Sequence, residues 1–274
     1  WFEYYAESME LNVWTKTTFI SAEYDKAKKN WNVKLKLSDG NERIMKPKHI
    51  VMAVGVSSVP NRTKIPGMDG YKGKVIHSTD YSSGRDYKGK NVLVFGTGTS
   101  AHDVAQDLYV HGANVKIVQQ SPSMVVNVEP SAQLPYQLYR EGPNTDDCDL
   151  ITISSPLKVL KKTHQLLTEK TKEIDKSLLD KLEEVGFRLE YGEENTGWQF
   201  KYLTRGGGYY FNVGASDLIA EGKIKVIQFS DIINFNASGI EMKSGDNLDI
   251  DLMVTATGYK GQEYVVEEFF GKSV

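Results

Sequence analysis

The sequence contains very little cysteine, no excess of basic residues and no long apolar run, and each of these features excludes a class of protein. Cys148 is the single cysteine among 274 residues, which excludes an intrachain disulfide, a Cys-x-x-Cys redox pair and a cysteine-rich zinc site. The acidic residues around it predict an ordinary loop thiol, and such sparse use of cysteine fits the reducing cytoplasm. The histidines show no ligand spacing, so we expect no metal site, and we expect His102 to lie on the surface of a helix.

The charge and the apolar runs exclude two kinds of partner. The formal net charge is -3, which argues against a nucleic-acid partner because such proteins present a basic surface. Apolar runs such as 50–54 and 92–95 have the length of strands, so we expect no membrane span. A hydrophobic content of 40% is sufficient for a packed core. Because the chain begins with Trp1 in the middle of a pattern and has no closing element, we expect a piece of a longer polypeptide.

The first 72 residues predict an antiparallel β-meander followed by a linker. Apolar and β-branched residues are concentrated in short runs with turn residues between them. The expected strands are 11–14, 19–24, 31–37 and a buried strand at 49–53. Residues 56–72 contain prolines and glycines and are typical of a linker.

The pattern then changes to alternating strands and helices. A strand at 91–95, a helix at 100–111 and a strand at 115–118 form a β-α-β unit, which implies a parallel sheet. Residues 122–150 carry four prolines and are expected to be irregular, whereas the apolar spacing over 156–185 predicts a pair of amphipathic helices. Further strands are expected at 225–229, 232–235, 240–243 and 252–255. The sequence therefore predicts an α/β protein.

A glycine-rich segment connects the first strand and helix of this unit. Gly96-Thr97-Gly98-Thr99-Ser100-Ala101 reads G-x-G-x-x-A, in which the first glycine permits a tight turn and the second lets the backbone approach a pyrophosphate. The helix that follows would present free N–H groups to the anion. Strand, loop, helix and second strand occur in the order of a Rossmann-like dinucleotide-binding fold, and a plain strand–helix turn is the alternative.

The end of the second strand bears on the choice of dinucleotide. An acidic residue there would bind the ribose hydroxyls of NAD or FAD, but the sequence reads Val118-Gln119-Gln120-Ser121. The absence of an acid permits a 2′-phosphate, although no arginine is present either. Lys116 or a residue from elsewhere in the chain is the candidate for the missing positive charge.

Residues 71–81 resemble the fingerprint F-x-G-x-x-x-H-x-x-x-[YF] of the flavin-containing monooxygenases, which are class B FAD- and NADPH-dependent enzymes. Gly73, His77 and Tyr81 match, and Tyr71 replaces the usual Phe. Tyr81 favours this family over the related Baeyer–Villiger enzymes. Ala256-Thr257-Gly258-Tyr259 is similar to the family's second ATG motif, and 52–55 is similar to the first.

The resemblance implies that a Rossmann-like NADPH domain is inserted into a second, FAD-binding domain. Residues 1–55 would then belong to the FAD-binding domain, 56–84 would be a linker that carries the fingerprint, 85–228 would be the NADPH-binding domain, and 229–274 would return to an incomplete FAD-binding domain. The family's FAD-binding glycine loop would precede residue 1. The family also uses an arginine where this chain has Gln120.

The resemblance further implies an activity and a set of site residues. It implies FAD and NADPH as cofactors and a small molecule and O2 as reactants, with a soft nitrogen or sulfur, or a carbonyl, as the group that is oxygenated. It implies a catalytic role for His77, although the same side chain could instead cap the turn before Tyr81. The predicted cofactor-binding residues are Gly73, Tyr81, Gly96, Thr97, Gly98, Thr99, Ser100, Ala101, Gln120, Ser121, Ala256, Thr257 and Gly258.

Two other functions stay open at this point. A flavoprotein reductase of the pyridine-nucleotide-disulfide oxidoreductase type would share two nested dinucleotide domains, but it would lack redox cysteines here. A non-catalytic nucleotide-binding fragment is the second alternative, and little turnover is expected of the isolated chain. The sequence does not decide the substrate, or whether the protein forms a homo-oligomer.

Overall fold

The computed structural model describes residues 1–271, which form two compact units. The first unit consists of residues 1–61 together with 258–271, and the second of residues 62–257. The second unit is thus inserted into the sequence of the first. Because the two units are separately compact, each is described by itself.

The first unit contains the predicted meander. Strands β1 (Thr18–Asp25), β2 (Asn30–Lys36) and β3 (Glu42–Met45) form an antiparallel sheet in the order β1-β2-β3. Helix α9 (Gln262–Phe270) packs on this sheet through aromatic contacts, with the rings of Phe19 and Phe269 5.1 Å apart. Helix α1 (Phe2–Ser8) buries none of its side chains.

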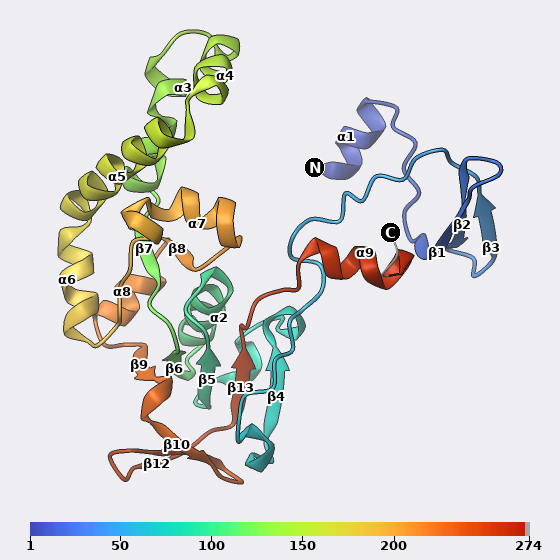
Figure 1. Cartoon of the computed structure of the whole chain (residues 1–274). Helices are drawn as coiled ribbons and strands as arrows, with labels where there is room; N and C mark the ends of the chain where they lie inside the picture. Colours follow the sequence, from blue (N-terminus) through green and yellow to red (C-terminus); the bar gives the residue numbers. More distant parts are fainter. Residues whose placement is uncertain (272–274) are drawn as a thin grey trace. The chain divides into compact units, whose positions relative to one another are not determined.

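The second unit is built on a five-stranded parallel sheet (Figure 1). Its order is β4-β13-β5-β6-β9, so the strand that comes last in the sequence lies next to the first strand of the β-α-β unit. The strands are β4 (Lys74–His77), β13 (Leu252–Thr255), β5 (Asn91–Phe95), β6 (Asn114–Gln119) and β9 (Lys225–Gln228). Because every pair is parallel, the carboxyl ends of these strands lie at one edge of the sheet.

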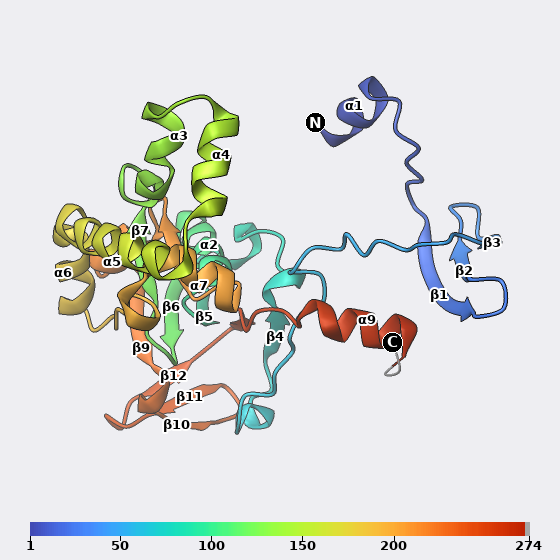
Figure 2. The same ribbon diagram turned by 45° about the horizontal axis from the view of Figure 1, so that its top comes forward.

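The two faces of this sheet are covered differently. One face packs against α2 (Thr99–Val110), α6 (Lys176–Glu184) and α8 (Ala215–Ala220) around a core that includes Val94 and Leu108. The other face packs against a three-stranded antiparallel sheet around Leu93, Phe95 and Phe235. That small sheet consists of β10 (Ile232–Phe235), β11 (Gly239–Met242) and β12 (Asn247–Asp249) (Figure 2).

A mainly helical region lies in the sequence between β6 and β9. Strands β7 (Met124–Asn127) and β8 (Tyr209–Asn212) pair in parallel over this span. Helices α3 and α4 lie side by side in both views (Figures 1 and 2). The helices are α3 (Gln137–Glu141), α4 (Thr145–Ser154), α5 (Leu157–Ile174) and α7 (Gly197–Arg205). Short 3-10 turns are Met68–Gly70, Ser78–Asp80, Arg85–Tyr87, Ser131–Tyr136, Glu193–Asn195 and Phe229–Asp231.

The predicted α/β class and parallel sheet are confirmed, but three local predictions are wrong. Residues 11–14 and 49–53 form no strand, and Val51 is 85% exposed, because β-branched residues do not pair without a partner edge. Residues 122–150 are not irregular, since they form β7, a 3-10 turn, α3 and α4; Pro135 lies inside the 3-10 turn, and the other prolines lie between these elements. Cys148 is no loop thiol: it is buried in α4, and its Sγ contacts the Leu138 carbonyl at 3.4 Å.

The expected domain limits also differ from the compact units. The chain passes between the units at 61/62 and 257/258 rather than near 55 and 228. The reason is that β4 and β13 belong to the central sheet, and that β10 to β12 cover it. The assignment of the units to FAD and NADPH stays a prediction.

Candidate dinucleotide site

The segment Gly96–Ala101 forms the connection between β5 and α2, and its two glycines differ in what the fold requires. Gly96 has φ +119°, and a Cβ there would lie 2.6 Å from the backbone oxygen of Ala256. Gly98 has φ -88°, which any residue adopts, and an added Cβ would meet no atom within 4 Å. The fold therefore requires glycine at 96, whereas at 98 it leaves a space that a side chain would fill.

Gly98 is also the residue that precedes the first turn of α2. The first amides of a helix have no partner within the helix, and no side chain caps them here. His102 of α2 stabilises the loop, because its Nδ1 donates to the Gly98 carbonyl oxygen at 3.1 Å. Thr99 is exposed, and the Oγ1 of buried Thr97 lies 2.6 Å from Ser123 Oγ. Because Gly98 lies at the N-terminus of α2, an anion in the space beside it would be stabilised by the positive end of the helix dipole.

His102 was expected on the surface, and this is wrong. Its side chain is fully buried and stacks on Tyr210 with the ring centroids 4.0 Å apart. Burial lowers the pKa of His102 from 6.5 to about 4, so the imidazole is neutral near neutral pH. The helical pattern alone cannot reveal this because Tyr210 belongs to β8, far along the chain.

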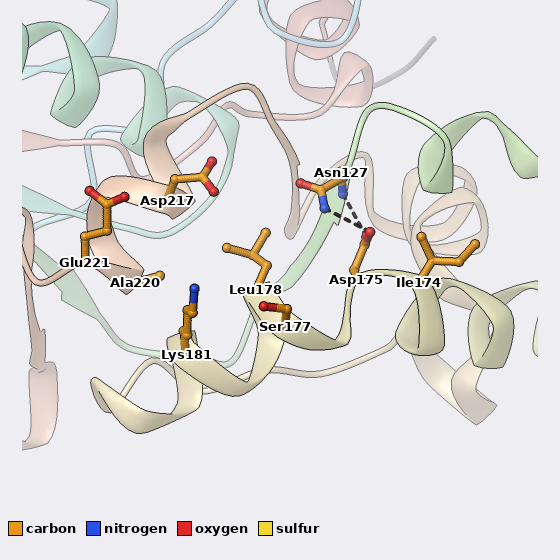
Figure 3. Close-up of a pocket in the computed structure, with 9 residues that line it drawn as sticks. All are labelled: Asn127, Ile174, Asp175, Ser177, Leu178, Lys181, Asp217, Ala220 and Glu221. Atoms are coloured by element: carbon orange, nitrogen blue, oxygen red, sulfur yellow. Dashed lines mark hydrogen bonds between the residues drawn. The ribbon is translucent and has the colours of Figure 1, made fainter.

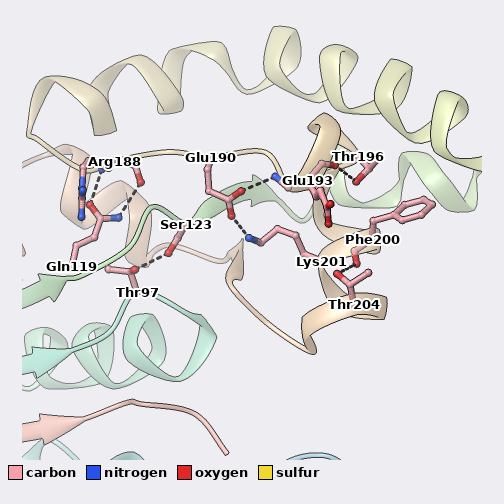
Figure 4. A network of polar contacts seen from close by, with 11 residues as sticks. Thr97, Gln119, Ser123, Arg188, Glu190, Glu193, Thr196, Phe200, Lys201 and Thr204 are labelled. Atoms are coloured by element: carbon pink, nitrogen blue, oxygen red, sulfur yellow. Dashed lines mark hydrogen bonds and ion pairs between the residues drawn. The ribbon is translucent and has the colours of Figure 1, made fainter. Parts of the chain in front are cut away.

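Gln119, the last residue of β6, lies beside Arg188 from another segment of the chain (Figure 4). Gln119 is buried and bonds both backbone groups of Arg188: its Oε1 accepts from the Arg188 N–H at 2.7 Å, and its Nε2 donates to the carbonyl at 2.9 Å. The Arg188 guanidinium donates to the Gln120 carbonyl at 2.7 Å. Gln120 and Ser121 are exposed. Sequence reasoning missed Arg188, because no motif marks the loop between α6 and α7.

The fingerprint residues at 71–81 have clear roles within the fold. Tyr71 is buried and donates to the Ile250 carbonyl at 2.8 Å, and a Cβ at Gly73 would collide with the Tyr71 ring. Tyr81 donates to Asp107 of α2 at 2.6 Å, and burial, together with this contact, raises the pKa of Tyr81 far above its usual range. Binding of a cofactor by Gly73 and Tyr81 stays a prediction.

His77 lies at the end of β4 and caps the turn that follows. Its Nδ1 accepts from the Thr79 N–H at 3.2 Å, and the side chain is only 2% exposed. Of the two roles that the sequence allowed for His77, capping of the turn is therefore the one that the structure shows. His77 pairs in register with Thr255, and Thr255 with Phe95, so His77 is level with the glycine loop at the same edge of the sheet. The proposed catalytic role is not tested by this geometry.

The Ala256–Gly258 segment divides between the two units. The Ala256 N–H donates to the Phe95 carbonyl at 2.8 Å, and its own carbonyl makes the close approach to Gly96. Thr257 ends the second unit. Gly258 belongs to the first unit, where its carbonyl accepts from the Asn61 N–H at 2.9 Å. The structure thus brings Ala256 to the glycine loop, together with Thr257 as the next residue of the chain.

Two of the cavities of the second unit lie close to residues considered above or to a buried acid. One of about 380 Å³ is lined by His77 and Thr255 at the carboxyl edge and by residues 62–71. The other, of about 210 Å³, lies between α6 and α8 (Figure 3). There the buried Asp175 accepts from the backbone and side chain of Asn127, both at 2.9 Å, and from Ser131 at 2.7 Å. These bonds tie β7 to the junction of α5 and α6, so we interpret this acid as structural.

Within residues 1–271, no group of three or more His, Cys, Asp or Glu side chains is arranged to hold a metal ion. No helix in the same range has both the length and the apolar character needed to cross a membrane.

Comparison with known proteins identifies the family of this chain. The family described as pyridine nucleotide-disulphide oxidoreductase matches residues 2–141. The chain is 29% identical over 258 residues to the probable indole-3-pyruvate monooxygenase YUCCA10 of Arabidopsis thaliana, a match that covers 93% of the chain and 60% of that relative. The chain belongs to the pyridine nucleotide-disulphide oxidoreductase family, and it is similar to relatives that are named monooxygenases.

Solved structures agree with this fold. Cyclohexanone monooxygenase from Rhodococcus sp. Phi1 bound to NADP+ matches with a TM-score of 0.59 at 18% identity, over 97% of this chain and 56% of that chain. The complex of OTEMO with FAD and NADP matches with a TM-score of 0.63 at 16% identity, over 94% and 55%. The chain therefore spans little more than half the length of these proteins.

Proposed function

We propose that this chain is the NADPH-binding part of an FAD- and NADPH-dependent monooxygenase that uses O2 to oxygenate a soft nitrogen or sulfur, or a carbonyl. The observation that carries the proposal is Gly98, where the fold leaves an open space at the start of α2 that a side chain would fill. A pyrophosphate fits this space, since the backbone can approach it and the N-terminus of α2 lies beside it. The relatives named as monooxygenases support the rest of the proposal.

The residues of this chain would bind and orient the cofactor and would not carry out proton transfer at a substrate. When bound, NADPH supplies a hydride and FAD activates oxygen. Gly96 turns the chain, Gly98 admits the pyrophosphate, and the amides of Thr99 and Ser100 would bind it. The Ala101 N–H donates to the Gly98 carbonyl at 3.1 Å, so Ala101 stays a predicted site residue through its small side chain. His102 keeps the loop in place through the Gly98 carbonyl. The site at the carboxyl edge of the sheet agrees with the usual location of ligands in parallel α/β folds.

The remaining assignments follow from the family resemblance. We propose residues 1–55 and 229–274 as parts of the FAD-binding domain, 56–84 as a linker and 85–228 as the NADPH-binding domain, with a small-molecule substrate and a cytoplasmic location. The domain limits differ from the compact units, as described above. Gly73, His77, Tyr81, Gln120, Ser121, Ala256, Thr257 and Gly258 stay predicted site residues.

A reductase that acts on disulfides is the less favoured alternative. Cys148 is the single cysteine, and it is buried in α4, so the chain holds no pair of thiols for such chemistry. Oxygen consumption that depends on NADPH and a soft nucleophile, measured on the full-length protein with its flavin, would support the monooxygenase. Reduction of a quinone or disulfide without oxygen uptake would contradict it, and a protein that binds NADPH without either reaction would be a non-catalytic nucleotide-binding module.

The glycine loop is tested by two substitutions that the structure predicts to act differently. Gly98→Ala places a methyl group in the open space, so we expect the free energy of unfolding to change by less than about 0.5 kcal/mol while NADPH affinity falls at least about 10-fold. Gly98→Val should abolish binding. Gly96→Ala is the matched control, because φ +119° and the Ala256 oxygen should make it cost about 2 kcal/mol of stability or more.

Calorimetric titration with NADPH and urea unfolding give the two readouts. Normal NADPH binding by Gly98→Val would show that the loop is a plain turn and that the proposed function is wrong. Equal destabilisation by Gly96→Ala and Gly98→Ala would show that the open space at Gly98 does not exist in solution.

A further inference from the structure

Arg188 lies where a dinucleotide of this fold would carry its 2′-phosphate. In a β-α-β dinucleotide fold, the adenine ribose reaches the end of the second strand, here Gln119 of β6 and the two residues that follow it. Gln119 fixes both backbone groups of Arg188, and the guanidinium donates to the Gln120 carbonyl at 2.7 Å. The Arg188 guanidinium, from the loop after α6, thus lies at the end of β6, where residues 118–121 include no acidic residue.

The Arg188 guanidinium keeps most of its hydrogen-bonding capacity. Among residues 1–271, no carboxylate forms an ion pair with it, whereas the exposed Arg62 is paired with Asp80 at 2.7 Å. A guanidinium has five N–H donors, and the contact with Gln120 uses one of them. Arg188 is exposed, so a ligand can reach it. The planar donor set matches a phosphate dianion in two-point geometry.

Lys116, the alternative suggested by the sequence, is less well placed. It lies on β6 four residues before Gln120, a separation of about 13 Å at about 3.3 Å per extended residue. It pairs in register with Leu93, well before the glycine loop. Burial and the nearby Lys225 also lower the pKa of Lys116, which makes its ammonium less favourable. The strand end is therefore reached by Arg188 and not by Lys116.

We propose that Arg188 binds the 2′-phosphate of the dinucleotide and makes this chain selective for NADPH over NADH. The proposal rests on the proposed function, because it needs a dinucleotide on the Gly96–Ala101 loop. Arg188 is a specificity residue in this assignment: it contacts the phosphate that distinguishes the two cofactors and takes no part in hydride transfer.

Titrations of the full chain with NADPH, NADH, adenosine 2′,5′-bisphosphate and 5′-AMP test the proposal. Arg188→Ala should weaken NADPH and the bisphosphate by about 10- to 100-fold and leave NADH and 5′-AMP within about 2-fold, because only the first pair carries the extra phosphate. Arg188→Lys should keep part of the preference. Arg205→Ala removes another exposed arginine and should change none of the four affinities.

Gln120→Arg in the Arg188→Ala background should restore the NADPH preference, since it supplies a cation at the same strand end. Equal weakening of NADPH and NADH by Arg188→Ala would show that Arg188 only holds the end of β6, and an unchanged preference would show that the phosphate binds elsewhere; either result overturns the proposal. A wild-type chain that binds NADPH and NADH equally overturns the role of Arg188 alone, whereas one that binds neither dinucleotide removes the proposed function as well.

Discussion

His102 shows how a single residue links the core of the second unit to the candidate phosphate loop. Its imidazole is buried between α2 and β8, stacks on Tyr210, and donates from Nδ1 to the carbonyl of Gly98. The other ring nitrogen, Nε2, is buried and has no hydrogen-bond partner among the described residues. The neutral ring tolerates this position, but a second proton on Nε2 would be buried without an acceptor.

We therefore expect His102 to make the stability of the protein depend on pH. Its pKa is about 4 in the folded state and about 6.5 in the unfolded chain, so protonation favours unfolding. The stabilising contribution is complete above pH 6.5 and is lost as the pH falls toward 4, by about 3 kcal/mol in total. Urea unfolding at intervals between pH 7 and 4 measures this loss.

The control for this prediction is His102→Phe, which keeps an aromatic ring and removes the titration. We expect its free energy of unfolding to fall less steeply between pH 6.5 and 4 than that of the wild type. Burial also lowers the pKa of His164, so a His164→Phe variant should remove a separate part of the slope. Parallel slopes for the wild type and His102→Phe would show that another group titrates.

At the scale of elements, local patterns predicted what depends on neighbouring residues and missed what depends on distant ones. The apolar spacing predicted α2 and the α5–α6 pair, because helical periodicity is local. It missed β8, since Tyr209 pairs with Met124 across 85 positions and the segment follows a run of glycines. Arg188 was missed for the same reason: only the folded chain brings it to Gln120.

The junction between α5 and α6 gives a prediction at this scale. Asp175 is 2% exposed and accepts three hydrogen bonds from Asn127 and Ser131, which attach β7 to the helices. Asp175→Asn replaces one acceptor oxygen by an amide that faces a donor, so we expect a loss of about 2 to 3 kcal/mol.

A matched control lies five residues further on. Asp180 forms an exposed pair with Lys176 at 2.6 Å, and Asp180→Asn should cost about 0.5 kcal/mol or less. Thermal or urea unfolding of the two variants gives the comparison. Similar losses for both would mean that the buried bonds of Asp175 do not hold the junction together.

At the scale of the whole chain, the sequence predicted the kind of fold better than its limits. The insertion of one unit within another and the parallel sheet were both expected, but the last strand of that sheet was assigned to the other domain. A strand at 252–255 was correctly predicted, yet its place between β4 and β5 depends on side chains more than 150 residues apart. Local sequence carries no signal for the order of strands in a sheet.

Two shorter chains, residues 62–257 and residues 85–228, test which of these two ranges folds as an independent domain. Residues 62–257 include the whole sheet and the small sheet over its second face, so we expect them to unfold cooperatively and to bind NADPH as the longer chain does.

Residues 85–228 lack β4, β13 and β10–β12. In that shorter chain Leu93, Phe95 and Val118, buried in the complete unit, would be exposed to solvent. Each such side chain loses about 1.5–3 kcal/mol of burial free energy, and together these losses are comparable to the whole free energy of unfolding of a typical domain. We therefore expect the shorter chain to be unfolded or molten by near-UV circular dichroism. A folded, NADPH-binding chain of residues 85–228 would show instead that β4 and β13 only lie against a sheet that is stable without them.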